Sequence, residues 1–186
     1  MLTAQEKEIL LKTARQSLEL KLRGEKLPPL NAASQTSLLQ ADGASFVTLT
    51  IGGKLRGCIG TIEAYQPLIE DVREHALAAA MNDYRFPKVQ LEELDTIEIE
   101  ISRLTKPVPL SYTDADDLLA KLRPGVDGVV LADGSQRATF LPQVWVQLPK
   151  AEEFLDHLCS KMGKSADLWR RKKLDVLIYQ VEEFRE

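Results

Sequence analysis

Cysteine and histidine are scarce in this sequence. Two residues are cysteines, Cys58 and Cys159, and two are histidines, His75 and His157. The cysteines lie far apart in the chain, whereas structural zinc sites usually take close ligand pairs. We therefore expect no metal site. With no export signal at the N-terminus, we expect both cysteines as free thiols in a reducing cytoplasm.

Long apolar runs and dense basic segments are also missing. No apolar run approaches the roughly 18 residues of a membrane-spanning helix, so we expect no membrane partner. The net charge of −4 argues against general nucleic-acid binding, which needs a dense basic face. The segment GKLRGCIG lacks the G-x-x-x-x-G-K-[ST] order of a phosphate-binding loop, and no dinucleotide fingerprint is present. The sequence thus implies no cofactor.

The remaining composition is typical of a globular protein, with 44% hydrophobic and 28% charged residues. Thr3 and Glu6 have the spacing of a capping box, and Leu or Ala recurs every four residues after them. This pattern predicts a helix over about 4–23. Similar patterns predict further helices over about 67–82, 114–123 and 152–162, the last ended by Gly163.

Alternation of apolar and polar residues predicts the strands. In TIEIEISRL the isoleucines face one side, while Glu98 and Glu100 face the other. The segment VDGVVLADGSQRATFL predicts a hairpin that turns at Asp133-Gly134, and LDVLIYQVEEF predicts one closing strand. Because helices and strands mix without strict βαβ alternation, we expect an α+β fold, with a largely antiparallel sheet and flanking helices.

A further hairpin is predicted on either side of Gly52-Gly53. A two-residue loop would pair Ile51 with Lys54 and set an apolar face against a polar one. A three-residue loop, Ile51–Gly53, pairs Leu49 with Leu55 instead and keeps the apolar faces together. We therefore expect the three-residue loop.

Cys58 follows this turn, with Arg56 before it and Gly57 and Gly60 beside it. In either register Arg56 and Cys58 share a face, because they are two apart on a strand. A nearby cation favours the nucleophilic thiolate, and the glycines would let a substrate approach the backbone. Two alternatives stay open: a structural thiol whose glycines allow tight packing of a helix, or a ligand contact without chemistry.

Neither histidine is placed near Cys58 by the sequence. His75 and His157 lie at the edges of apolar helical stripes, where a boundary or surface position is more common than a catalytic one. Cys159 lies four residues after Leu155 on such a stripe and is most simply a core residue.

Arginines form a second group of candidates. If the fold gathers Arg56, Arg85 and Arg137, their guanidinium groups could clamp a carboxylate or phosphate. The alternative is three separate, salt-bridged surface residues. Glu98 and Glu100 are the natural ion-pair partners on their strand, and either could also act as a general base.

The segment LRGCIGT, residues 55–61, resembles the signature of the AMMECR domain family, whose prokaryotic members are called AmmeMemoRadiSam system protein A. Further blocks follow in the family's order and cover nearly the whole chain. They are RFP at 85–87, IEIS at 99–102, GVDGVVL at 125–131, ATFLPQVW at 138–145 and EEFLDHLC at 152–159.

This resemblance implies a single AMMECR domain over residues 1–186, with a larger and a smaller lobe and a cleft lined by the signature. It also implies a cytosolic protein, an active site around the signature, and functional association with Memo-like and radical-SAM proteins. The positions that match the family's motifs are Arg56, Gly57, Cys58, Gly60, Arg85, Phe86, Thr139 and Pro142.

Together these observations predict an enzyme or enzyme-like component that acts on a small anionic molecule or in a modification pathway. Cys58 and Arg56 are its expected catalytic residues, with Arg56 as anion clamp or thiolate stabiliser. Gly57, Gly60, Arg85, Phe86, Thr139 and Arg137 are the expected ligand-binding residues. The rival hypothesis is a non-catalytic binding module, in which the signature shapes a groove for a ligand or partner.

Overall fold

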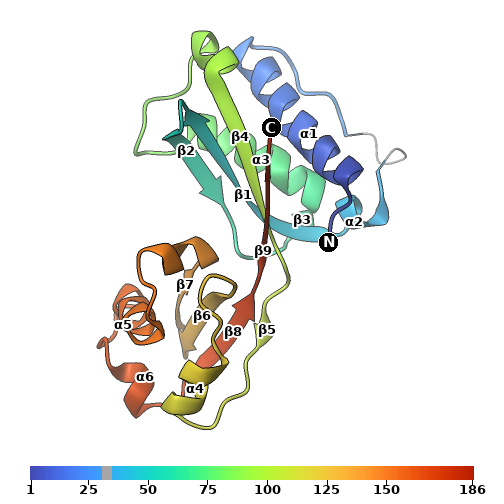
Figure 1. Cartoon of the computed structure of the whole chain (residues 1–186). Coiled ribbons are helices and arrows are strands. Elements are labelled where there is room, and N and C mark those ends of the chain that lie inside the picture. Colours follow the sequence, from blue (N-terminus) through green and yellow to red (C-terminus); the bar gives the residue numbers. More distant parts are fainter. Residues whose placement is uncertain (31–34) are drawn as a thin grey trace. The chain divides into compact units, whose positions relative to one another are not determined.

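The computed structural model describes residues 1–30 and 35–186, and this part of the chain divides into two compact units (Figure 1). Unit 1 comprises Met1–Leu104 and Glu182–Glu186, and unit 2 comprises Thr105–Val181. The chain thus leaves unit 1 once and returns to it for its last residues. The fold is α+β, with antiparallel strand pairs and flanking helices, as the sequence predicts.

Unit 1 is built on a sheet with strand order β2-β1-β4-β9, to which β3 adds through β1. Its strands are β1 (Asp42–Ile51), β2 (Lys54–Gly60), β3 (Gln66–Pro67), β4 (Ile97–Leu104) and β9 (Val181–Arg185). Its helices are α1 (Ala4–Leu22), α2 (Ser37–Gln40), α3 (Leu68–Met81) and the 3-10 helix η2 (Leu91–Thr96). The predicted capping box is present at the start of α1, where Thr3 and Glu6 bond each other's backbone.

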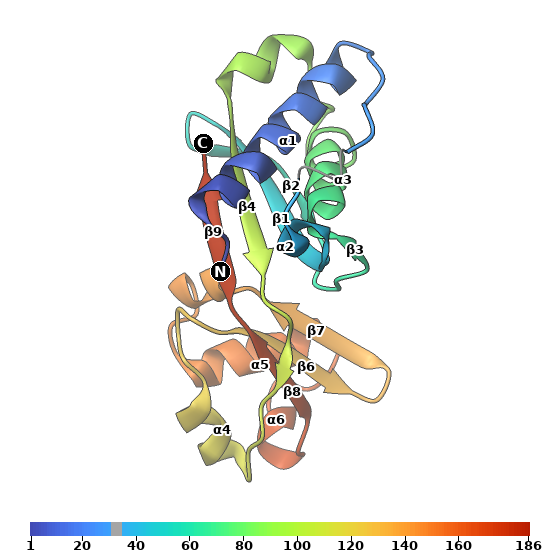
Figure 2. The same cartoon turned by 90° about the vertical axis from the view of Figure 1, so that its right-hand side faces the viewer.

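Both long helices, α1 and α3, lie on the same side of this sheet (Figure 2). In the register of β1 with β4, Leu49 lies opposite Ile99 and Val47 opposite Ile101, and all four side chains are fully buried in the core that the helices cover. Because strand side chains alternate, the residues between them face the other side. We call that other side the open face of the sheet. It carries polar residues.

The hairpin between β1 and β2 differs from the predicted one. Ile51 pairs with Lys54, so the loop has two residues, and the prediction of a three-residue loop is wrong. Gly52 and Gly53 both have positive φ, 55° and 75°, as a type I′ turn requires. The clash of faces that argued against this register is relieved by a β-bulge at Arg56, after which Leu49 pairs with Gly57.

Unit 2 has a second sheet, with strand order β5-β8-β6-β7. Its strands are β5 (Val108–Pro109), β6 (Gly128–Asp133), β7 (Gln136–Phe140) and β8 (Asp175–Tyr179). Its helices are α4 (Ala115–Lys121), the 3-10 helix η3 (Pro142–Val146), α5 (Ala151–Lys161) and α6 (Leu168–Arg171). The predicted hairpin is present, with Asp133 paired to Gln136, and Gly163 with φ 79° follows the end of α5.

The predicted single closing strand is wrong, because the segment forms β8 in one sheet and β9 in the other. Gln180 separates them. Its N–H donates to Thr105 Oγ1, and the Thr105 N–H donates to the Gln180 carbonyl. The two places where the chain changes sheet are thus tied together side by side.

Candidate functional site

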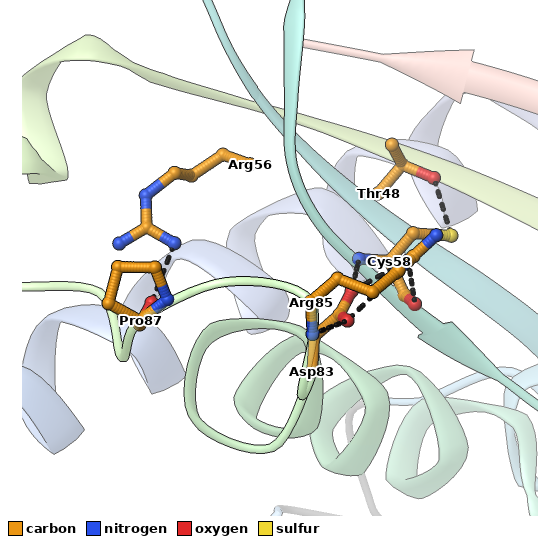
Figure 3. Close-up of polar contacts among 6 residues, drawn as sticks. All are labelled: Thr48, Arg56, Cys58, Asp83, Arg85 and Pro87. Carbon is orange, nitrogen blue, oxygen red and sulfur yellow. Dashed lines mark hydrogen bonds and ion pairs between the residues drawn. The ribbon is translucent and has the colours of Figure 1, made fainter.

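Cys58, Thr48 and Glu100 form a row across three neighbouring strands on the open face of unit 1. Thr48 of β1 pairs with Cys58 of β2 on one side and with Glu100 of β4 on the other. The Thr48 hydroxyl donates a hydrogen bond of 3.2 Å to Cys58 Sγ (Figure 3). Cys58 is half-buried, whereas Cys159 is fully buried. The sequence-predicted thiol therefore lies on a polar surface rather than in a core.

The backbone of Cys58 is held by the loop that follows α3. Its N–H donates to Asp83 Oδ2 (2.9 Å), and its carbonyl accepts from Arg85 Nη2 (3.2 Å) (Figure 3). Arg85 in turn binds both oxygens of Asp83, at 2.9 and 2.7 Å. Because β2 is an edge strand, these outward backbone groups have no neighbouring strand. The Asp83–Arg85 pair takes that strand's place.

Asp83, which is not among the site residues predicted from the sequence, stands out electrostatically. Its side chain is 2% exposed. The bond from Arg85, together with the N–H groups of Cys58 and Arg85 itself, holds the pKa of this carboxyl well below its usual range. The same bond raises the pKa of Arg85. The only signal in the sequence was an aspartate two residues before Arg85 in the NDYRFP segment.

Arg56 does not contact Cys58, because its guanidinium binds elsewhere. It donates to both oxygens of Glu93 in η2 (2.7 and 2.9 Å) and to the Pro87 carbonyl (2.8 Å). In Figure 3 its side chain runs toward Pro87, away from Cys58. The bidentate bond from Arg56 lowers the pKa of the Glu93 carboxyl. The expected partners, Glu98 and Glu100, are not the ones that Arg56 binds, because the bulge places it toward η2.

We expect Arg56→Ala to lower the free energy of unfolding by about 1–2 kcal/mol, because it removes a bidentate pair whose side chains are 13% and 29% exposed. The rate of Cys58 alkylation should stay within about twofold of wild type, since the guanidinium makes its bonds away from the thiol. Urea denaturation and labelling kinetics test the two parts. Lys54→Ala, on the same strand, is the control, and a large fall in labelling would restore Arg56 as a thiolate partner.

The two glycines of the signature are closely packed. A Cβ on Gly57 would lie 2.2 Å from the Ala79 carbonyl oxygen of α3, and one on Gly60 would lie 2.4 Å from both Phe46 Cγ and Ser45 O. Gly57 therefore allows the helix to approach the strand, which is the packing alternative that the sequence left open.

His75 was expected at a boundary or on the surface, but it is 5% exposed. Its Nδ1 lies 3.2 Å from Asp71, which also accepts a bond of 2.6 Å from the Ser45 hydroxyl. These residues belong to the helix-covered side of the sheet. His157 is exposed, as expected, and its Nδ1 lies 2.8 Å from the Glu153 carbonyl. Neither His75 nor His157 forms a hydrogen bond or ion pair with Cys58.

The remaining sequence candidates fall into both units. Phe86 is half-buried in unit 1, with the Arg85 guanidinium 5.6 Å from its ring centroid. Arg137, Thr139 and Pro142 lie in unit 2, with Arg137 exposed on β7. The Thr139 hydroxyl donates to the Val129 carbonyl (2.9 Å) and lies 3.0 Å from the hydroxyl of Tyr179. Tyr179 is 1% exposed, and this burial raises its pKa to about 12, so its hydroxyl belongs to the interior of unit 2.

Within residues 1–30 and 35–186, no helix could span a membrane and no cluster of side chains could hold a metal ion. None of the helices there is long and apolar enough to cross a membrane. Over the same residues, His, Cys, Asp and Glu form no group of three or more that could hold a metal ion.

The fold and the row define the class: an α+β protein of two units, with a thiol on the open face of one sheet. The sequence pattern of the AMMECR1 family matches residues 11–184. The chain belongs to this family.

Similar proteins match the whole of this chain over more than nine-tenths of their own length. A protein of Methanothermobacter thermautotrophicus is 40% identical over 186 residues, which cover 100% of this chain and 96% of the relative. Protein MJ0810 of Methanocaldococcus jannaschii is 36% identical and covered to 92%. The crystal structure of the uncharacterized protein PH0010 from Pyrococcus horikoshii matches with a TM-score of 0.85 and 32% identity, over 100% of this chain and 93% of that one.

Proposed function

We propose that this protein is a cytoplasmic enzyme, or an enzyme-like component, in which the Cys58 thiol reacts with a small molecule. One observation carries the proposal. Cys58, the half-buried one of the two cysteines, lies on the open face of the sheet. Its sulfur accepts a hydrogen bond from the Thr48 hydroxyl, and Glu100 lies next in the same row. A structural cysteine is usually buried among apolar side chains, as Cys159 is.

Each group near Cys58 has a role in this proposal. Cys58 is the nucleophile, and Thr48 orients its sulfur. Glu100, next in the row, is the acidic group that a ligand in contact with the thiol can reach. Arg85 holds the Cys58 backbone through Nη2. Its Nη1 makes none of the bonds to Asp83 or Cys58, so it can donate to an anionic group of the substrate.

The proposal keeps the functional association with Memo-like and radical-SAM proteins that the family resemblance implies. The second candidate function is a binding module without chemistry. It is favoured by the bonds that fix both backbone groups and the sulfur of Cys58, because such bonds also suit a thiol that only shapes a groove.

We expect iodoacetamide to alkylate Cys58 about tenfold or more faster than Cys159 in the native protein. Cys159 is fully buried, and its burial raises the pKa of the thiol. Peptide mass spectrometry after timed labelling measures both rates. The Cys58→Ser and Cys159→Ser variants assign each rate to one thiol.

The same assay separates the two functions. An enzyme should show a Cys58 that reacts faster than free glutathione at the same pH, and Thr48→Val should change that rate. A Cys58 no faster than glutathione, and insensitive to Thr48→Val, contradicts the enzyme and supports the binding module.

A further inference from the structure

The charges around the Cys58 row do not balance. Both nearby guanidinium groups are already bound to carboxylates, Arg56 to Glu93 and Arg85 to Asp83, each through two bonds. In contrast, the side chains of Glu98 and Glu100 on β4 have neither a hydrogen bond nor an ion pair with any residue that the structure describes. Two negative charges on the open face therefore lack a partner.

Glu100 is the more informative of the two, because it is half-buried while Glu98 is exposed. Partly shielded carboxylates usually gain a cation or a hydrogen-bond donor. Glu93 and Glu182, which are also half-buried, do so through Arg56 and Lys7. Glu100 is half-buried like them, but its carboxylate has no such partner. Its oxygens are therefore free to accept a hydrogen bond from a cationic group of a ligand.

The position of Glu100 relates it to the thiol. It lies opposite Thr48, which lies opposite Cys58, so the backbones of Glu100 and Cys58 are two strand spacings, roughly 10 Å, apart. A glutamate side chain reaches about half that distance. A small ligand in contact with Cys58 Sγ is therefore within reach of the Glu100 carboxylate. The order across the sheet is Arg85, Cys58, Thr48, Glu100.

Resting on the proposed function, we infer that the substrate is a small zwitterion that carries a protonated amine. The amine binds Glu100, and Glu98 adds to the attraction from two residues away along β4. The anionic end binds Arg85 Nη1 at the edge of the sheet, which leaves the reacting atom between them, over Cys58. Amino-acid-like molecules have this arrangement of charges.

Charged thiol reagents test this inference without knowledge of the substrate. Methanethiosulfonates that carry trimethylammonium-ethyl, sulfonatoethyl or methyl groups differ mainly in charge. In each reaction the Cys58 thiolate attacks the sulfenyl sulfur, a disulfide forms, and methanesulfinate leaves with the electron pair of the broken S–S bond. The second-order rates are measured on Cys159→Ser protein, so that Cys58 is the only thiol present.

We expect Glu100→Gln to lower the ratio of the cationic to the anionic rate by about three- to tenfold at low salt, and by less at high salt. Glu98→Gln should lower it less, since Glu98 is exposed and lies two residues further along β4. Glu19→Gln is the matched control: it is also a half-buried glutamate, but it lies on α1, behind the sheet. It should leave the ratio unchanged.

The outcomes separate the two proposals. If the neutral reagent modifies Cys58 no faster than glutathione, the proposed function fails. If the neutral reagent reacts rapidly, but Glu100→Gln changes the charge ratio no more than Glu19→Gln does, the thiol site stands and the amine-binding inference is overturned. A fall in the ratio that disappears at high salt supports the inference.

Discussion

Replacement of Gly57 by alanine is expected to lower the free energy of unfolding by on the order of 3 kcal/mol. The new Cβ would lie 2.2 Å from the Ala79 carbonyl oxygen and 3.1 Å from its carbon. Both are backbone atoms in the last turns of α3, so no side-chain rotation relieves the contact. Strand β2 or helix α3 must shift, and Gly57→Val should be worse. Urea denaturation measures the loss.

Gly52→Asn is the matched control in the same hairpin. Gly52 has φ 55° and nothing within 4 Å of an added Cβ, and Asn-Gly is a favoured pair for a type I′ turn. We expect this variant to be as stable as wild type. Wild-type stability of Gly57→Ala would contradict the packing explanation and leave close approach of a ligand as the reason for Gly57. Rescue of Gly57→Ala by Ala79→Gly would also contradict it, because the contacted atoms are backbone.

The long helices could be predicted because their signals are local. Thr3 and Glu6 begin α1, and Gly163 follows α5, each through contacts within a few residues. The hairpin register could not be predicted in this way. The bulge at Arg56 depends on contacts with Glu93 and Pro87, and the following Gly57 depends on α3. Strict alternation along the strand was therefore a wrong assumption there.

The closing strand shows the same limit. The apolar run 176–179 leads through Gln180 directly into Val181, and no glycine or proline marks the change from β8 to β9. The change is fixed by the bonds between Gln180 and Thr105, which are far apart in the sequence.

The candidate site was found only in part. Cys58 stood out by its setting among glycines, and Glu100 by its strand pattern. That Thr48 joins them follows from the pairing of β1 with both neighbours. Asp83 was missed, because its role depends on β2 being an edge strand, and strand order is not written in the sequence next to Asp83.

Asp83→Asn should lower the free energy of unfolding at pH 7 by about 2–3 kcal/mol. Asparagine can still accept the Cys58 N–H bond through its carbonyl oxygen, but its NH₂ group would face the donors of Arg85. The side chain of Arg85 is 45% exposed, so its unpaired charge is partly hydrated and the loss stays below that of a fully buried pair. Cys58 alkylation should also change, since the Asp83–Arg85 pair fixes the Cys58 backbone.

The pH dependence identifies the charge of Asp83 as the cause. Because folding lowers the pKa of Asp83, its ionised form stabilises the fold above the unfolded-state pKa of about 4. This contribution is lost progressively as the pH falls below 4, toward the folded-state pKa. The stability difference between wild type and Asp83→Asn should therefore be constant from pH 7 to about 5 and shrink in more acidic solution. Asp42→Asn, which replaces an exposed aspartate on β1, is the control for the loss of one surface charge. A difference that stays the same down to pH 2 would mean that the shape of Asp83, and not its charge, holds the edge of β2.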